Sequence, residues 1–207
     1  MTHISGDVMK KIIIITFLIL MTSFSLHAGK LTNIGMKIGY NSSTFGGKNL
    51  PGKGVSNVPG FTLGGFASYE LSKKFSVQPE ILLTTKGSRI NTVGDIEQYN
   101  IFVYVEIPIL AKYRLLQSGN FYLRGLCGPG FSLKALAMND VGVLDNIRGI
   151  DCGLIAGAEV GLGRFSFELR YEFGLLNFDT SSDDADLKNK SISFLFGIAF
   201  VHQGSNS

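Results

Sequence analysis

The sequence predicts an all-β fold: an eight-stranded antiparallel up-and-down transmembrane β-barrel preceded by a signal peptide. Three observations lead to this prediction. Apolar and polar residues alternate along eight segments, the connections between these segments are alternately long and short, and an apolar leader precedes them all. Alternation with a period of two indicates β-strands, because successive side chains of a strand point to opposite faces of its sheet.

The leader has the composition of a secretory signal peptide. Two lysines follow Met9, which is the more natural start, and an apolar run of about 15 residues then leads to the small residue Ala28. Such a run is too short for a good membrane-spanning helix. We therefore expect a signal peptide over residues 1–28 and one barrel domain over residues 29–207.

The first four alternating segments cover residues 31–42, 60–71, 74–86 and 99–115. Each has a large apolar side chain at most of its alternate positions. In the first segment these side chains are Ile34, Met36, Ile38 and Tyr40. Small, polar or charged residues such as Lys37 stand between them, so each segment has one apolar face and one polar face.

The last four segments cover residues 121–135, 150–162, 164–176 and 190–201. The alternation is clearest in the seventh, where one face is wholly apolar and rich in aromatic residues. The opposite face of that segment carries Glu168, Arg170 and Glu172. A strand of this kind suits either a soluble sandwich, with its charged face in water, or a membrane barrel, with its charged face inside.

The lengths of the connections decide between these two folds. Short turns are expected at residues 72–73, 117–120 and 161–163, and long connections at residues 43–58, 87–98, 137–148 and 177–189. A sandwich has no reason to alternate long and short connections, whereas outer-membrane barrels have short turns on the periplasmic side and long loops outside. Closure into a barrel also removes the exposed edges of the sheet.

In such a barrel the apolar side chains face lipid and the charged ones fill the interior. The aromatic residues expected to face lipid are Phe165, Phe167, Tyr171, Phe173, Phe194, Phe196 and Phe200. The charges expected inside are Lys37, Glu80, Glu106, Lys112, Arg124, Glu159, Glu168, Arg170 and Glu172. Eight strands enclose a space that side chains just fill, so we expect these charges to pair as a structural plug; a solute path is the alternative.

The spacing of the hairpins predicts one particular charge network. If strands five to seven pair about the centres of their connections, Arg124 lies opposite Glu159 and Glu159 lies opposite Glu168. Two carboxylates in a low-dielectric interior repel, so a cation must bridge them. Arg124 and Arg170 are placed to do so, which predicts a network Arg124–Glu159–Glu168–Arg170.

Five short stretches, spread over the whole mature chain, carry a family resemblance. They are Gly39–Ser43, Gln78–Leu83, Glu106–Tyr113, Gly128–Gly130 and Glu168–Tyr171. Together they resemble the PorT-like outer-membrane β-barrel family of the Bacteroidetes, a porin family whose fold is similar to that of OmpX. The resemblance implies a monomer in the bacterial outer membrane, bound to its lipid. One branch of the family is implicated in secretion, which makes envelope or secretion-machinery proteins possible partners.

Several function classes are disfavoured by composition. The net charge is +3, or +2 once the leader is removed, and lacks the basic stripe of a nucleic-acid-binding protein. His202 is the only histidine after the leader, whereas enzymes of outer-membrane barrels use a histidine base. We expect no catalytic residues, no metal and no cofactor; the acidic run from Asp179 to Asp186 is read as a solvated loop rather than a calcium site.

Two further features concern the wall of the barrel. Pro79, Pro108 and Pro129 are expected to form a row across neighbouring strands, as a line of bulges or a bend. Cys127 and Cys152 lie on adjacent expected strands, and geometry decides whether they are bridged.

The sequence thus predicts a non-enzymatic integral outer-membrane barrel that presents four extracellular loops and has a filled lumen. Its expected role is binding or adhesion, or envelope assembly of the PorT-like, secretion-associated kind. Two alternatives stay open: a narrow solute channel, and a secreted soluble barrel of the lipocalin type, which requires an apolar interior.

Overall fold

The computed structural model describes residues 30–48, 54–91, 97–139, 142–143, 150–175 and 186–202. The expected signal peptide, its alternative start and nearly all of the acidic run lie outside these residues. Within them, no helix is long and apolar enough to cross a membrane.

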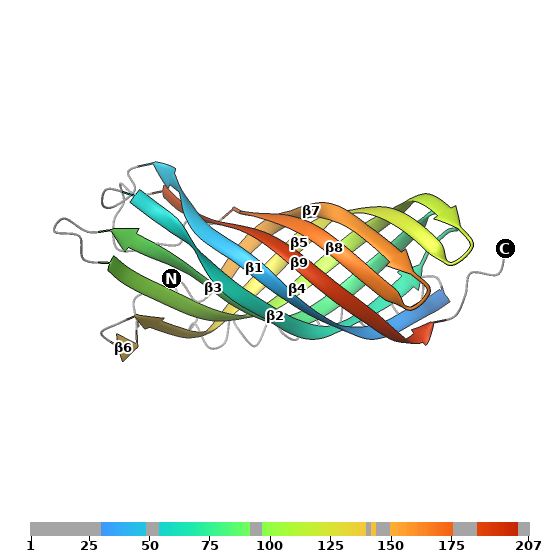
Figure 1. Ribbon diagram of the computed structural model, residues 1–207, viewed down its shortest axis with the longest axis horizontal. Coiled ribbons are helices and arrows are strands. Elements are labelled where there is room, and N and C mark those ends of the chain that lie inside the picture. The colour runs from blue at the N-terminus through green and yellow to red at the C-terminus, as the bar shows by residue number, and fades with distance from the viewer. Residues whose placement is uncertain are drawn as a thin grey trace, which may run out of the picture.

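Eight long strands make up the fold, with one two-residue strand added (Figure 1). In chain order they are β1 (Lys30–Lys48), β2 (Gly54–Glu70), β3 (Phe75–Asn91), β4 (Glu97–Ser118), β5 (Phe121–Asn139), β6 (Gly142–Val143), β7 (Ile150–Leu162), β8 (Phe165–Gly174) and β9 (Asp186–His202). Each long strand pairs antiparallel with its neighbours, and β1 pairs with β9. The sheet therefore closes into an eight-stranded up-and-down barrel, and β6 is attached only to the end of β5.

The three short turns lie at one end of the barrel, together with the start of β1 and the end of β9 (Figure 1). Gly119 and Gly163 begin two-residue turns with φ of 55° and 59°. Glycine populates such positive φ values without steric cost, and tight hairpin turns need them. We call this end the turn end and the opposite one the loop end.

Several strands run further towards the loop end than the sequence analysis predicted. The expected connection over residues 43–58 is largely strand, because β1 continues to Lys48 and β2 starts at Gly54. The last residues of β1 pair with β9, from Ser43 opposite Ser191 to Lys48 opposite Asp186. Residues rich in Gly, Ser and Lys have low strand propensity, but pairing with a neighbouring strand overrides propensity.

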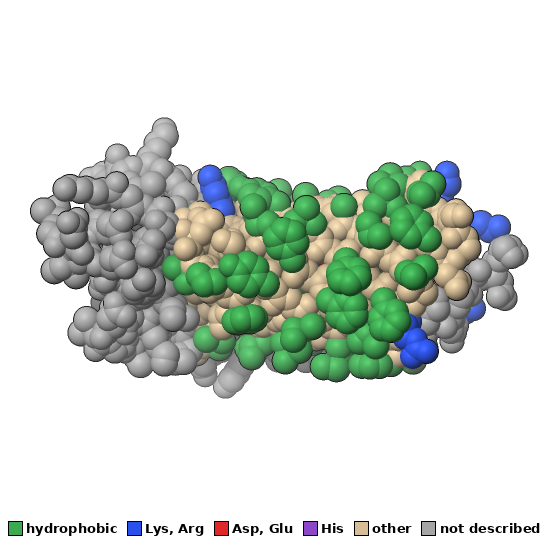
Figure 2. Space-filling view, viewed as in Figure 1, with side chains coloured by type: hydrophobic (Ala, Val, Ile, Leu, Met, Phe, Trp, Pro, Cys, Tyr) green, Lys and Arg blue, Asp and Glu red, His purple; other side chains and the backbone are tan. Residues whose placement is uncertain are grey.

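Along most of the strands the side chains alternate between the two faces of the wall, with breaks such as Leu115 and Leu116, which are both exposed beside a register shift. In β8, exposed and buried residues follow each other along most of the strand. The aromatic residues expected to face lipid point outward, and Phe167 and Phe200 are each 63% exposed. Hydrophobic side chains are distributed along the whole visible wall of the barrel (Figure 2). The lipocalin-like alternative is therefore wrong, because the apolar face is outside.

The prolines form the expected row but no bulges. Pro79 lies opposite Ile109, and Pro108 lies opposite Gly130, next to Pro129. The register of β3 and β4 is unbroken along the whole pairing, and β4 and β5 shift register only elsewhere. The expected line of bulges is therefore wrong: the ladder passes the prolines without an inserted residue.

The two cysteines are free. Cys127 lies opposite Ala156, whereas Cys152 lies opposite Phe131, so the two are four positions apart along the ladder. At about 3.3 Å per residue this is about 13 Å, beyond the reach of a disulfide bond.

Candidate functional site in the barrel lumen

The interior of the barrel, which we call the lumen, is filled with charged and polar side chains. Period-two strands direct one face of every strand inward, so each contributes buried residues at alternate positions. Lys37, Glu80, Lys112 and Glu159 are each at most 2% exposed. Charges buried this deeply must pair, because an unpaired one would keep its desolvation penalty.

A ring of alternating charge is formed by four buried side chains of the lumen: Lys37, Glu80, Arg170 and Glu168. Lys37 Nζ lies 2.6 Å from Glu80 Oε1 and 2.5 Å from Glu168 Oε1. Arg170 donates through Nη1 and Nη2 to the two oxygens of Glu80, both at 2.8 Å, and through Nε to Glu168 Oε2 at 2.7 Å. The residues come from β1, β3 and β8, so the ring crosses the lumen. A forked, charge-assisted contact of this kind is among the stronger hydrogen bonds in proteins.

Lys112, Glu159 and Arg124 extend this ring towards the turn end. Lys112 Nζ contacts Glu168 Oε1 at 2.7 Å and also pairs with Glu159. Arg124 Nη1 donates to Glu159 Oε1 at 3.0 Å. We call the seven residues the central cluster: Lys37, Glu80, Lys112, Arg124, Glu159, Glu168 and Arg170. With four cations and three carboxylates, it has a formal charge of +1.

The ladder places Arg124 opposite Glu159 and Glu159 opposite Glu168, as the hairpin spacing predicted. The expected bridging cations were Arg124 and Arg170, and these contact Glu159 and Glu168 respectively, but the cation that contacts both glutamates is Lys112 of β4. Among the carboxylates of the described residues, Arg124 pairs with Glu159 alone. Strand spacing along neighbouring hairpins cannot reveal a contact that crosses the lumen.

A second group of charges lies nearer the loop end. Lys86 Nζ lies 2.5 Å from Glu106 Oε1 and 2.5 Å from Glu172 Oε2. Thr84 donates to Glu106 Oε2 at 3.2 Å, and Ser191 donates to Glu172 Oε2 at 3.3 Å. We call Lys86, Glu106 and Glu172 the loop-side cluster. Its formal charge of −1 balances that of the central cluster.

Glu106 and Glu172 lie inside, as predicted, and Lys86 lies inside without having been among the predicted lumen charges. Lys86 has the same parity as Glu80 and Thr84 on β3, so the period-two pattern contains the signal. The alternation predicts a strand that ends at Lys86, whereas β3 continues to Asn91, so Lys86 lies within the strand and not at its end.

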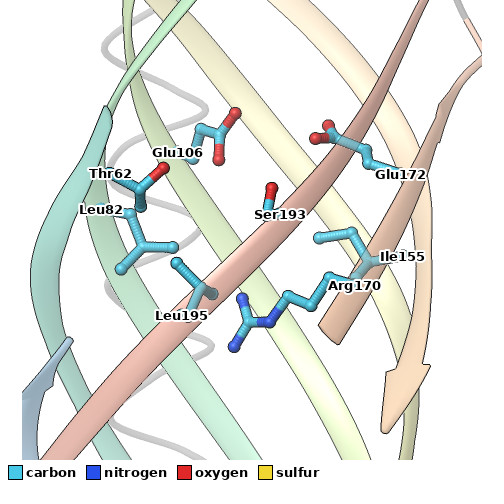
Figure 3. A pocket seen from close by; sticks show the side chains of 8 residues that line it. All are labelled: Thr62, Leu82, Glu106, Ile155, Arg170, Glu172, Ser193 and Leu195. Atoms are coloured by element: carbon cyan, nitrogen blue, oxygen red, sulfur yellow. The ribbon is translucent and has the colours of Figure 1, made fainter. Parts of the chain in front are cut away.

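The space left between the two clusters is small. Described residues line a cavity of about 20 Å³, which is just enough for one water molecule. Figure 3 shows its walls, with the carboxylates of Glu106 and Glu172 on one side and the guanidinium of Arg170 on another. Towards the turn end, a second cavity of about 10 Å³ lies beside Tyr122 and Arg124. Neither cavity could admit a ligand larger than water.

No group of His, Cys, Asp and Glu side chains suited to hold a metal ion occurs among the residues that the structure describes. The carboxylates of both clusters already face lysine or arginine. What this arrangement can do is hold the wall together from inside and close the lumen; it presents no nucleophile–base pair.

Comparison with known proteins gives a family and a fold. The family model described as "Outer membrane protein beta-barrel domain" matches residues 23–180. Ail, the attachment invasion locus protein of Yersinia pestis, aligns over 83% of this chain and 100% of its own, with 19% identity and a TM-score of 0.50. Neisserial surface protein A aligns over 83% and 99%, with 11% identity and a TM-score of 0.51.

No curated protein sequence matches the chain. The low identities to the two solved barrels make them evidence for the fold alone. The match to the family model covers more than half of the chain. The chain therefore belongs to the outer-membrane protein β-barrel family, and it is a transmembrane barrel of the bacterial outer membrane.

Proposed function

We propose that this protein is a non-enzymatic, monomeric barrel with a closed lumen, which acts through its four long connections as a binding or adhesion protein. The observation that carries the proposal is the pairing of the lumen charges. The central and loop-side clusters occupy the cross-section with side chains that are at most 7% exposed, apart from Arg124 and Glu172. A lumen filled in this way has no room for a solute, so the surface that remains for function is the loop end.

The charged face of the lumen also supports a structural role. Eight strands enclose a space that side chains just fill, and the two clusters neutralise each other. A narrow channel would need a continuous polar path, whereas the cavities lined by described residues hold about one water molecule each. We therefore favour a plug over the channel alternative.

The position of the last histidine supports a non-enzymatic role. His202 ends β9 opposite Asn33, at the turn end of the barrel. The connections at the loop end contain no histidine in the sequence, so a Ser–His–acid site cannot be assembled there.

Topology is the first part of this proposal to test. With the loop end outside and both ends of the barrel domain periplasmic, protease added to intact cells should cut near residues 49–53, 92–96, 144–149 and 176–185. The turns at residues 71–74, 119–120 and 163–164 should be cut only after the outer membrane is opened. Cleavage of those turns in intact cells would reverse the orientation.

The charge of one loop-end connection bears on the class of partner. Ail has been solved with a heparin analogue, sucrose octasulfate. In this chain the longest undescribed connection contains Asp179, Asp183 and Asp184, and no basic residue between them. Like charges repel, so we favour a protein partner over a sulfated glycan.

The resemblance to PorT-like barrels favours a protein of the envelope or of its secretion machinery as that partner. The test is a pull-down from detergent-solubilised membranes with the wild-type barrel and with a variant whose residues 176–185 are replaced by a short Gly-Ser turn. The heat-dependent shift of the folded band in gel electrophoresis checks that the variant still folds. A protein captured by the wild type and lost by the variant supports the proposal; identical captures from both would contradict it.

A further inference from the structure

The turn end of the barrel carries an exposed ring of positive charge. Lys30 begins β1, Lys73 and Lys74 form the turn between β2 and β3, and Arg164 lies in the turn between β7 and β8. All four residues are exposed. Figure 2 shows most of its visible basic side chains at this end, with one near the opposite end, and no acidic side chain among the coloured residues of this face. We call these four residues the basic rim.

The basic rim has no exposed counter-charge among the described residues. Glu70 lies opposite Lys30 in the ladder, but its carboxylate faces Arg114, with Arg114 Nη2 3.5 Å from Glu70 Oε1. The third turn, from Gln117 to Asn120, is polar and uncharged. The positive charge of the rim is therefore available to a partner.

Exposed aromatic residues lie directly beside the rim. Phe75 is 37% exposed, Tyr113 48%, Phe121 38% and Phe165 43%. Phe75 pairs with Tyr113 in the ladder, while Phe121 and Phe165 both lie opposite Leu162 on β7. Outer-membrane barrels carry a girdle of aromatic residues at each membrane interface, and these four, which lie next to the short turns, are placed to form the girdle at the turn end.

The order in which apolar and basic side chains follow each other towards the turn end indicates which partner the basic rim contacts. Passing from the wall to the turn end, the exposed apolar side chains continue as far as the strand ends, and Lys74 and Arg164 come one residue beyond Phe75 and Phe165. In a bilayer the hydrocarbon gives way to the interface and then to the phosphate layer in the same order. A soluble protein or polymer would not require the charges to begin where the apolar band ends.

We propose that the basic rim binds the phosphate groups of glycerophospholipids in the leaflet at the turn end, and that it prefers anionic headgroups. The rim would thereby fix the depth and tilt of the barrel in the bilayer. This role is independent of the loops and of their partner.

The test compares lipid association in reconstituted membranes. Wild-type barrel is placed in phosphatidylcholine vesicles, and the association of spin-labelled phosphatidylglycerol relative to spin-labelled phosphatidylcholine is measured by electron paramagnetic resonance. The rim variant combines Lys30→Gln, Lys73→Gln, Lys74→Gln and Arg164→Gln. The matched control removes three lysines and one arginine from strand residues at the loop end: Lys48→Gln, Arg89→Gln, Lys188→Gln and Lys190→Gln.

The wild type and the control should prefer phosphatidylglycerol, and the rim variant should lose that preference by at least about fivefold, which is the effect of one Lys or Arg near an anionic surface. Raising the salt to about 1 M shortens the screening length to about 3 Å and should weaken the preference of the wild type. An unchanged preference in the rim variant, or an equal loss in the control, would overturn the proposal. If the fourfold variant fails to fold, the double change Lys73→Gln and Lys74→Gln, confined to an exposed turn, gives the same comparison.

Discussion

The buried charges of the lumen differ in how many partners each of them has. Arg170 bonds to both Glu80 and Glu168 and is 5% exposed. Among the described residues, Arg124 forms one ion pair, with Glu159, and lies over the ring of Tyr122; its side chain is 14% exposed. Arg170 is more deeply buried and makes more hydrogen bonds to carboxylates than Arg124, so these two arginines should not be equivalent.

We expect Arg170→Ala to destabilise the folded barrel by about 3–5 kcal/mol, because two buried carboxylates, Glu80 and Glu168, lose their hydrogen bonds to its guanidinium. Arg124→Ala should cost clearly less. The midpoint of the heat-dependent gel shift in a zwitterionic detergent measures both, with the exposed Arg164→Ala as the control for loss of an arginine. Equal midpoints for Arg170→Ala and Arg164→Ala would contradict the role given to the central cluster.

The outward residues offer a matched pair for the membrane environment. Phe167 and Leu162 are both 63% exposed, but Leu162 lies directly before a short turn whereas Phe167 lies further along the wall. An arginine facing lipid costs about 2–4 kcal/mol near the bilayer midplane and about 0–1 kcal/mol near the interface. Phe167→Arg should therefore lower the unfolding free energy in lipid vesicles much more than Leu162→Arg, as measured by urea titration. The reverse order would place Phe167 outside the hydrocarbon layer.

At the scale of the elements, the order and pairing of the strands could be predicted but their ends could not. Alternation indicates a strand wherever one face of the segment is apolar. In β1 the apolar face extends to about Tyr40, and in β3 it extends to about Leu83. Beyond these residues both faces are polar, so residues such as Ser43 give no alternating signal although they lie in β1. Their strand structure comes from the neighbouring strand, which a local pattern does not contain.

Two of the three short turns contain a glycine that the backbone conformation requires, at Gly119 and Gly163. Gly163 has φ of 59°, and a Cβ atom built on it would have no neighbour within 4 Å. Gly163→Ala should therefore destabilise the barrel by about 1–2 kcal/mol through backbone conformation alone. In Gly65→Ala, the control, the nearest atom to the new Cβ is Gly35 O at 3.6 Å, and the effect on the urea midpoint should be small. If Gly163→Ala were as mild as Gly65→Ala, the turn would not depend on left-handed backbone.

For the whole molecule, closure of the sheet joins parts of the sequence that no local pattern connects. Lys37 of β1 and Lys112 of β4 meet at one oxygen of Glu168 on β8. Sequence periodicity predicted that all three point inward, because parity fixes the face of each residue. It could not predict which of the inward charges meet, since that depends on the diameter of the barrel and the stagger of its strands.

The central claim is that paired side chains close the lumen, and the conductance of the folded barrel in a planar lipid bilayer tests it most directly. Purified wild-type protein, shown to be folded by its gel shift, should insert without raising the current above that of the bare membrane, while a general porin prepared in the same way gives discrete steps. Reproducible unit steps from the wild-type barrel that scale with the amount of folded protein would contradict the account.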